Sequence, residues 1–350
     1  MLFRLLNILS KRKWFKGSNF IITKTIRKKV RIYNNISEIG QIKNPVVTVG
    51  TFDGVHIGHQ KVINQLVSTA KAMDGESVII TFEPHPRQVL QPGFDLRIII
   101  TREEKIRILE KCGVDHFIII EFTREFAQNS SEEFLRKYIV EPLKPVKIII
   151  GYDHHFGKGR QGNIDFLMEM GAKYNFAVGQ IGMQDIKHIA VSSTKIRDAI
   201  KRGDMKEVSE FLGYNYSISG TVVHGNQIGR TLGFPTANIK PDHPDKLIPA
   251  NGVYAVLVEW NGKLYKGMSN IGVRPTLNLH TLTIEVNIFD FDEMIYDENI
   301  TIFFLEHTRD EKKFRDLDLL RRRLIIDKLK VQKIFGEDVQ GDSENGVSLE

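Results

Sequence analysis

Cysteine is nearly absent from this chain of 350 residues, and long apolar runs are absent. Cys112 is the single cysteine, which excludes an internal disulfide and a zinc site built from several thiolates. The apolar run at residues 2–9 is interrupted by Arg4 and Asn7, and it is shorter than the roughly 20 residues of a membrane-spanning helix. No small-residue cleavage site of the secretory kind follows it. We therefore expect a cytoplasmic protein without a membrane partner.

Acidic residues are missing from residues 1–31, which contain ten Lys or Arg. Without this segment the chain has 39 basic and 43 acidic residues, so the overall net charge of +6 becomes −4. The folded part is mildly acidic, and we expect no nucleic-acid partner. We interpret residues 1–31 as a disordered extension, with a basic arm on a membrane surface as the alternative. Residues 336–350 carry five acids and are expected to be a disordered tail.

We predict a first domain at residues 43–213, in which strand-like and helical patterns alternate from Lys43 to about Ile186. Such alternation predicts an α/β domain with a parallel, doubly wound sheet, in which ligands bind beyond the carboxyl ends of the strands. The strand-like runs are residues 46–49, 78–82, 117–120, 146–150 and 177–181. The helical stretches are residues 59–72, 102–112, 131–142 and 163–174.

The segment VVTVGTFDGVHIGHQ, residues 46–60, is the first candidate site. Gly50 ends a strand-like run, and helical spacing follows, so the segment predicts a strand, a tight loop and a helix start. A helix N-terminus favours phosphate, Gly58 allows it to approach the backbone, and His56 and His59 can donate to the same oxygens. The alternative is that both histidines are ordinary surface or core residues.

Three further motifs fall at strand ends or helix starts of the same domain. TFEPHP (residues 81–86) closes the second run, and GYDHHFGKGRQG (residues 151–162) follows the fourth. VSSTKIR, residues 191–197, opens a helix with hydroxyls and an arginine. Helix capping explains this last motif as well as phosphate binding does.

Residues 214–335 change to strand-like runs separated by turns. Asn261-Gly262 is a hairpin signal, and helical spacing returns at residues 311–334. We predict a small antiparallel β-barrel followed by a C-terminal helix. The strand-like runs are residues 216–223, 253–260, 263–268, 283–289 and 300–305.

The second candidate site is GTVVHGNQIGRTLGFPTANI, residues 220–239. Its glycines and Arg230 could wrap a phosphate chain, although β-turns need glycines as well. Thr236 and Asn238 offer hard oxygen ligands that suit Mg²⁺, and turn chemistry is the alternative. Glu285 stands among apolar residues in a strand, where it is either exposed or used as a base.

In this order, the motifs resemble the bacterial bifunctional riboflavin kinase/FAD synthetase family. The resemblance runs from about Pro45 to about Lys330 and is carried by GTFDGVHIGHQ, TFEPHP, FGKGRQGN, VSSTKIR, GRTLGFPTANI, NGVYAV, NIGVRPT and IEVNIFDFD. It implies that a C-terminal barrel phosphorylates riboflavin to FMN, and that a Rossmann-like nucleotidylyltransferase domain adenylylates FMN to FAD with release of pyrophosphate. It implies riboflavin, FMN and ATP as substrates, with Mg²⁺ as the cofactor.

The resemblance also implies roles for individual residues. Those placed in catalysis are Glu285, as the base of the kinase, and His56, His59 and Arg197 in adenylyl transfer. Those expected to bind ATP and its phosphates are Gly50, Phe52, Asp53, Gly58, Ser193, Thr194, Gly225, Gly229 and Arg230. Those expected to bind flavin are His85, Asp153, Phe156 and Gly157. Thr236 and Asn238 are expected to hold the metal.

Three positions depart from the family pattern. His154 replaces a frequent aromatic residue, Asn287 replaces a common histidine, and Asp297 replaces the glycine of a Tyr-Gly pair, which bears on the local turn and on flavin affinity. Three other interpretations stay open: a nucleotidylyltransferase for pantetheine phosphate or a cytidylyl donor, a flavin carrier without turnover, and a zinc protein that uses the histidine pairs. We expect a monomer or a weak homo-oligomer.

Overall fold

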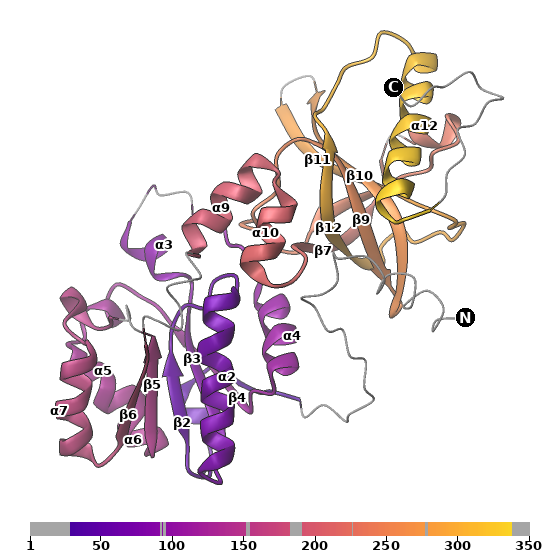
Figure 1. Ribbon diagram of the computed structural model, residues 1–350. Coiled ribbons are helices and arrows are strands. Elements are labelled where there is room, and N and C mark those ends of the chain that lie inside the picture. Colours follow the sequence, from indigo (N-terminus) through magenta and orange to yellow (C-terminus); the bar gives the residue numbers. More distant parts are fainter. Residues whose placement is uncertain are drawn as a thin grey trace. The chain divides into compact units, whose positions relative to one another are not determined.

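The computed structural model describes residues 29–91, 93, 96–151, 155–182, 191–225, 227–276 and 279–337. The chain packs into two compact units, Met1–Ser193 and Thr194–Glu350, which Figure 1 colours from indigo to yellow. Most of the extension and most of the tail expected from the sequence lie outside the described residues. Within the described residues, no helix is both long and apolar enough to cross a membrane.

The first unit is built on a six-stranded parallel sheet with the strand order β1-β4-β3-β2-β5-β6. Its β-branched runs favour strands, and its central strands are buried on both faces, as parallel strands are. The predicted parallel sheet is confirmed. The strands are β1 (Arg31–Tyr33), β2 (Val46–Val49), β3 (Ser77–Glu83), β4 (His116–Glu121), β5 (Lys147–Gly151) and β6 (Ala177–Ile181).

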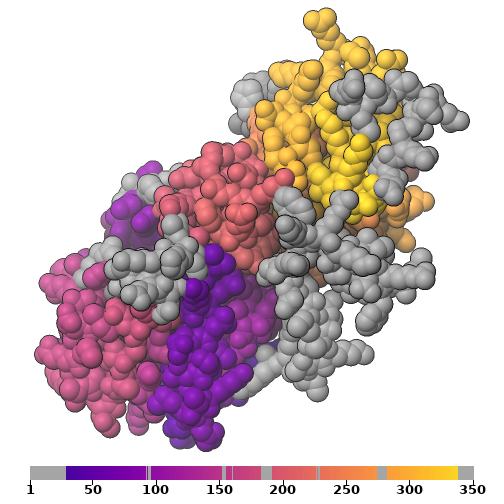
Figure 2. Space-filling view, in the orientation of Figure 1, coloured from indigo at the N-terminus to yellow at the C-terminus, as the bar shows by residue number. Residues whose placement is uncertain are grey.

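Helices cover both faces of this sheet. The helical segment from α5 to α6 and helix α7 pack on one face through a core that includes Val47, Ile80 and Phe134. Helix α2 packs on β2, β3 and β5 beside α4, and its outer face is part of the purple surface in Figure 2. The helices are α2 (Ile57–Ala72), α3 (Pro86–Leu90), α4 (Arg102–Cys112), α5 (Ser131–Leu135), the π-helical turn η4 (Arg136–Val140), α6 (Glu141–Leu143) and α7 (Ile164–Tyr174). Short 3-10 turns are η2 (Ile36–Glu38), η3 (Phe126–Gln128) and η5 (Lys158–Arg160).

The edge strand β1 was not expected from the sequence. Arg31, which we assigned to the extension, is the first residue of this strand, and Tyr33 is the last. Three residues are too few to show a period of two. Pairing with β4 decides the conformation, and the Tyr33 hydroxyl lies 3.1 Å from Nδ1 of the buried His116.

The second unit contains a closed antiparallel barrel with the strand order β10-β11-β8-β7-β12-β9. Asn261 and Gly262 take φ values of 48° and 71° between β9 and β10, so the predicted hairpin is confirmed. Strand β8 was missed, because its sequence ANIKP buries only Ile239. The strands are β7 (Ser217–Val223), β8 (Ala237–Pro241), β9 (Gly252–Trp260), β10 (Lys263–Thr276), β11 (Leu279–Ile288) and β12 (Asn299–Arg309), and α11 (Ile228–Thr231) is a short helix.

Helices α9 (Ser193–Arg202) and α10 (Met205–Leu212) belong with the barrel except for Ser193. The Lys206 ammonium lies 2.9 Å from Glu306 on β12, and Ala250 N–H donates to the Ile200 carbonyl at 3.3 Å. The two units therefore divide before Thr194, whereas the change in sequence character comes after Gly213.

The predicted C-terminal helix is present as α12 (Leu317–Ile334). It begins later than the expected residue 311, because the Asp316 carboxylate caps the helix by accepting from Leu319 N–H at 2.8 Å. Met268 and Phe289 of the barrel pack against Val331 and Phe335 in one core.

A buried ion pair joins α12 to β12. The Asp327 carboxylate is fully buried and accepts from Arg309 Nε at 2.9 Å and from Arg309 Nη2 at 2.7 Å. Arg323 Nε lies 3.0 Å from the same carboxylate. Removal of one member leaves buried charge uncompensated.

We predict that Asp327→Ala lowers the free energy of unfolding by about 3–5 kcal/mol, since two arginines lose their buried partner. Chemical denaturation measures the change. Asp318→Ala, an exposed acid in the first turn of the same helix, is the control and should change stability by less than about 1 kcal/mol, the size of its interaction with the helix dipole. Equal stability of the two variants would contradict the role of the ion pair.

Candidate active sites

The turn between β2 and α2 is strained. Phe52, Gly54 and Val55 take φ values of 46°, 84° and 33°. Left-handed backbone is unfavourable for residues other than glycine, especially β-branched ones, and such positions cost about 1–3 kcal/mol each. Strain of this kind persists only where the surroundings hold it and is common at functional sites.

Several separate segments hold this turn through Asp53 and Val55. Asp53 is buried, and its Oδ1 accepts from Ile99 N–H at 3.1 Å. Its carbonyl accepts from the Ser193 hydroxyl at 3.0 Å, across 140 residues of sequence. Gln60 Nε2 donates to the Val55 carbonyl at 2.8 Å. Asp53 and Ser193, both predicted to bind phosphate, are thus in contact in the structure, and both stabilise the turn.

His56 and His59 stand at the start of α2 with their rings stacked, 3.7 Å between centroids. His56 is the N-cap of the helix, and its Nδ1 accepts from His59 N–H at 3.3 Å. Nδ1 therefore carries no proton, so the neutral ring has its proton on Nε2 and can donate from that atom. A Cβ at Gly58 would lie 3.2 Å from the His56 ring, so Gly58 gives this ring its room.

The second histidine is kept neutral by its surroundings. Burial is the largest cause that holds the pKa of His59 well below 6.5, and the neighbouring His56 and Lys105 lower it further. Its Nδ1 is buried and has no hydrogen-bond partner within the described residues. A bound phosphate would supply negative charge beside it and raise this pKa.

The aromatic residue of the turn packs on the histidine pair. The Phe52 ring lies edge-on to His59, with 5.2 Å between centroids. A Cβ at Gly50 would lie 3.0 Å from the Phe52 ring, so Gly50 accommodates that ring. The remaining predicted residues of this site, Thr194 and Arg197, belong to the second unit, and their participation stays a prediction.

His85, Phe156 and Gly157, the predicted flavin residues that the structure describes, lie on two loops of the first unit. His85 caps α3, where its Nδ1 accepts from Arg87 N–H at 3.1 Å. Phe156 packs on Phe134 at 5.5 Å between centroids, and the Ser131 hydroxyl donates to the Phe156 carbonyl at 3.2 Å.

Gly157, which follows Phe156 on the same loop, also packs closely on Ser131. Gly157 has a φ of 73° and packs so tightly on Ser131 that a side chain has no room. Asp153 and His154 lie outside the described residues.

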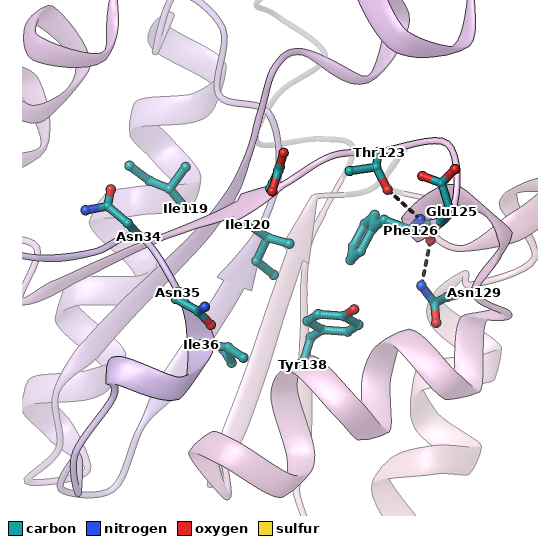
Figure 3. Close-up of a pocket in the computed structure, with 11 residues that line it drawn as sticks. Asn34, Asn35, Ile36, Ile119, Ile120, Thr123, Glu125, Phe126, Asn129 and Tyr138 are labelled. Carbon is teal, nitrogen blue, oxygen red and sulfur yellow. Dashed lines mark hydrogen bonds between the residues drawn. The ribbon is translucent and has the colours of Figure 1, made fainter.

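A separate pocket of about 440 Å³ opens beside the carboxyl end of β4. Asn34, Asn35 and Ile36 lie on one side of it, with Phe126 and Tyr138 on the other (Figure 3). Among the described residues that line it there are two carboxylates and no Lys or Arg, which does not suit phosphate. His85, Phe156 and Gly157, the predicted flavin residues that the structure describes, do not line it.

The barrel brings together the residues predicted for the kinase. Glu285 on β11 pairs with Asn238 on β8, and the Thr236 hydroxyl donates to Glu285 Oε2 at 3.2 Å. A Cβ at Gly225 would overlap the Asn238 amide, and one at Gly229 would lie 3.4 Å from the Thr236 hydroxyl and overlap the Phe234 carbonyl. Both glycines therefore make room for the proposed metal ligands and their segment.

Two departures from the family pattern have structural explanations. The buried Asn287 donates from Nδ2 to the Pro235 carbonyl at 2.7 Å, and so holds the segment that carries Thr236. Asp297 has a φ of 63°, the left-handed conformation that a glycine would adopt readily. Its N–H donates to the Val222 carbonyl at 2.9 Å, so the turn is kept without glycine.

The sequence reasoning missed two residues of the first site, Lys105 and Thr81. Both donate to the Thr51 carbonyl, at 2.9 Å and 3.2 Å. Lys105 stands three and four residues before Ile108 and Leu109, on the apolar face of its helix, where lysine is unusual. That anomaly was the available signal. Among the described residues there is no cluster of three metal-ligating side chains, so the zinc interpretation finds no support there.

Comparison with known proteins agrees with this architecture. The profile of FAD synthetase matches residues 39–195, and that of riboflavin kinase matches residues 212–335. A bifunctional riboflavin kinase/FMN adenylyltransferase from Buchnera aphidicola subsp. Schizaphis graminum is 37% identical over 314 residues, with 88% of this chain and 99% of the relative covered. The protein of that name from Escherichia coli strain K12 is 32% identical over 310 residues, covering 88% and 98%.

A solved structure from Streptococcus pneumoniae, described as a macrolide-efflux protein, has a TM-score of 0.78 and 31% identity. It covers 87% of this chain and 99% of its own. The efflux description belongs to that protein, and the likeness shows a shared fold.

The fold and the matched domains define a two-domain transferase of flavin nucleotide synthesis, with an FAD synthetase domain before a riboflavin kinase domain. The chain belongs to the family of bifunctional riboflavin kinase/FMN adenylyltransferases.

We predict that Gly225→Ala lowers riboflavin phosphorylation by about 10²-fold, because the new methyl displaces the Asn238 amide and misplacement of about 1 Å costs that much. Steady-state FMN formation measures it. Gly40→Ala, where a Cβ meets open space, is the control. Normal turnover of Gly225→Ala would exclude a positioned Asn238 from the kinase site.

Proposed function

We propose that the barrel phosphorylates riboflavin at its ribityl hydroxyl and that the α/β domain transfers AMP from ATP to the resulting FMN, releasing pyrophosphate. The observation that carries this proposal is the strand pairing that sets Glu285 opposite Asn238, with the Thr236 hydroxyl 3.2 Å from the Glu285 carboxylate. A carboxylate beside two neutral oxygen ligands is the set that a kinase acting on an alcohol requires.

In the kinase site, Glu285 is the base that accepts the proton of the attacking ribityl hydroxyl. Thr236 and Asn238 present oxygens of the kind that Mg²⁺ prefers, and the space left by Gly225 and Gly229 admits them without a clash. When bound, Mg²⁺ supplies charge neutralisation to the phosphates of ATP. Arg230, exposed beside this segment, contacts the phosphate chain.

In the adenylyl-transfer site, the phosphate of FMN attacks the α-phosphorus of ATP in line, and pyrophosphate leaves. The attacking oxygen is already ionised, so no general base is needed. The start of α2, the Nε2–H of His56 and the ring of His59 stabilise the charge that develops on the leaving group. His85, Asp153, Phe156 and Gly157 receive the flavin.

Product analysis tests the whole proposal. The full chain is incubated with riboflavin, ATP and Mg²⁺, and the flavins are separated by chromatography. FMN should form first and FAD should follow from it. ATP that is not consumed would identify a flavin carrier, and an adenylylated or cytidylylated product other than FAD would identify a different nucleotidylyltransferase.

The variant Glu285→Gln distinguishes two interpretations of Glu285, a catalytic base and an exposed strand residue without a catalytic role. It keeps the shape and removes the proton acceptor, so FMN formation should fall by roughly 10²–10⁴-fold. FAD formation from supplied FMN should stay unchanged, because that chemistry belongs to the other domain. Glu293→Gln, an exposed acid of the same unit, is the matched control, and equal kinase rates in the two variants would remove Glu285 from catalysis.

His59→Ala should lower FAD formation by roughly 10²–10³-fold while leaving FMN formation intact, because one donor to the developing charge is lost. Since the pKa of His59 lies well below 6.5, this ring stays neutral as the pH rises from 6.5 to 8. The kcat/KM profile of the free enzyme should therefore show no titration of His59 in that window. Asn64→Ala, exposed on the same helix, is the control, and full FAD synthesis by His59→Ala would contradict the assigned role.

A further inference from the structure

Lys105 is a buried cation beneath the first site. Its side chain belongs to α4, and the residue is only 7% exposed. Burial is the main cause that lowers its pKa from the usual value, and the carboxylates of Asp53 and Glu83 partly oppose this effect. A buried ammonium is costly unless it is paired and hydrogen-bonded, so its retention calls for a specific contact.

That contact is the Thr51 carbonyl, at the start of the strained turn. Lys105 Nζ donates to it at 2.9 Å, and the Thr81 hydroxyl donates to the same oxygen at 3.2 Å. A carbonyl oxygen has two lone pairs, so these two donors occupy both. The oxygen is thereby directed into the protein and withheld from any anion bound above the turn.

The ammonium is also electrostatically coupled to the histidine pair. Its charge is one of the three causes that lower the pKa of His59. The positive charge of Lys105 disfavours a second positive charge on His59, so it favours a negatively charged group bound beside His59. Lys105 therefore combines a fixed backbone contact with a fixed positive charge in a buried environment, where both act strongly.

We propose that Lys105 is a positioning residue of the adenylyl-transfer site, which fixes the Thr51–His56 turn through the Thr51 carbonyl and adds positive charge beneath the pyrophosphate of ATP. The inference rests on the proposed function of the first domain. According to this inference, Lys105 affects the binding of the phosphates of ATP and of pyrophosphate, and it does not affect the binding of the flavin.

The test uses the full chain in both directions of the reaction, FAD formation from FMN and ATP, and FMN and ATP formation from FAD and pyrophosphate. Lys105→Met keeps the length and removes the charge and donor. We expect FAD formation to fall by about 10–10²-fold and the KM for pyrophosphate to rise by about tenfold or more, while the KM for FAD stays near that of the wild type. Lys105→Arg, which restores charge and donor, should recover most of the lost rate.

Two controls separate positioning from general stability. Lys111→Met makes the same substitution at an exposed position of α4 and should keep wild-type kinetics. Riboflavin phosphorylation should be unchanged in every variant, and circular dichroism and thermal unfolding report whether the first domain is folded. Thr81→Val, which removes the second donor to Thr51, should change the same two parameters in the same direction, and it provides the test if Lys105→Met does not fold.

The outcomes distinguish this inference from the proposed function. A wild-type chain that makes no FAD from FMN and ATP would refute the function of the domain. Wild-type FAD synthesis together with a folded Lys105→Met variant of unchanged kcat and KM would overturn the inference alone. The inference would also be overturned if Lys105→Arg folds and is as impaired as Lys105→Met. If Lys105→Met does not fold, unchanged kinetics of Thr81→Val would overturn it.

Discussion

The first domain depends on one constraint, the left-handed backbone between β2 and α2. Phe52 and Val55 would not hold their positive φ values in isolation. Donors from β3, α4, the segment before α4 and the start of α9 converge on this turn and keep it in place. The result is that α2 begins where strand order reverses between β2 and β5, the edge at which doubly wound sheets bind ligands.

In the barrel, the candidate site residues are positioned by the register of the strand pairing between β8 and β11. A slip of one residue between β8 and β11 would move Glu285 away from Asn238 and turn alternate side chains to the other face. The segment before β8 is held in this register by two contacts. Asn287 donates to the Pro235 carbonyl, and the backbone at Gly225 packs closely on the Asn238 amide. The two candidate sites therefore place their polar groups by different means, the first by a strained turn and the second by strand pairing.

The chemistry explains this difference. In adenylyl transfer the nucleophile is already charged, so the site needs donors and positive charge, which we propose that a helix start, two histidines and a buried lysine provide. In riboflavin phosphorylation the nucleophile is a neutral alcohol, so the site needs an acceptor for its proton. Ile284 and Val286 are buried on the opposite face of the same strand, which fixes the face on which the Glu285 side chain lies, and the Thr236 hydroxyl donates to its carboxylate.

Local pattern in the sequence determined the central strands, the long helices, the hairpin at Asn261-Gly262 and the glycine- and histidine-rich turn, because each has a periodicity or a turn residue of its own. Tertiary structure alone decided β1 and β8, which are too short or too polar to show a period and form by pairing with neighbours. It also decided the place of α9 and α10 against the barrel, the bond between Ser193 and Asp53, and the burial of Lys105. These depend on contacts between residues far apart in the chain, and no local pattern encodes such contacts.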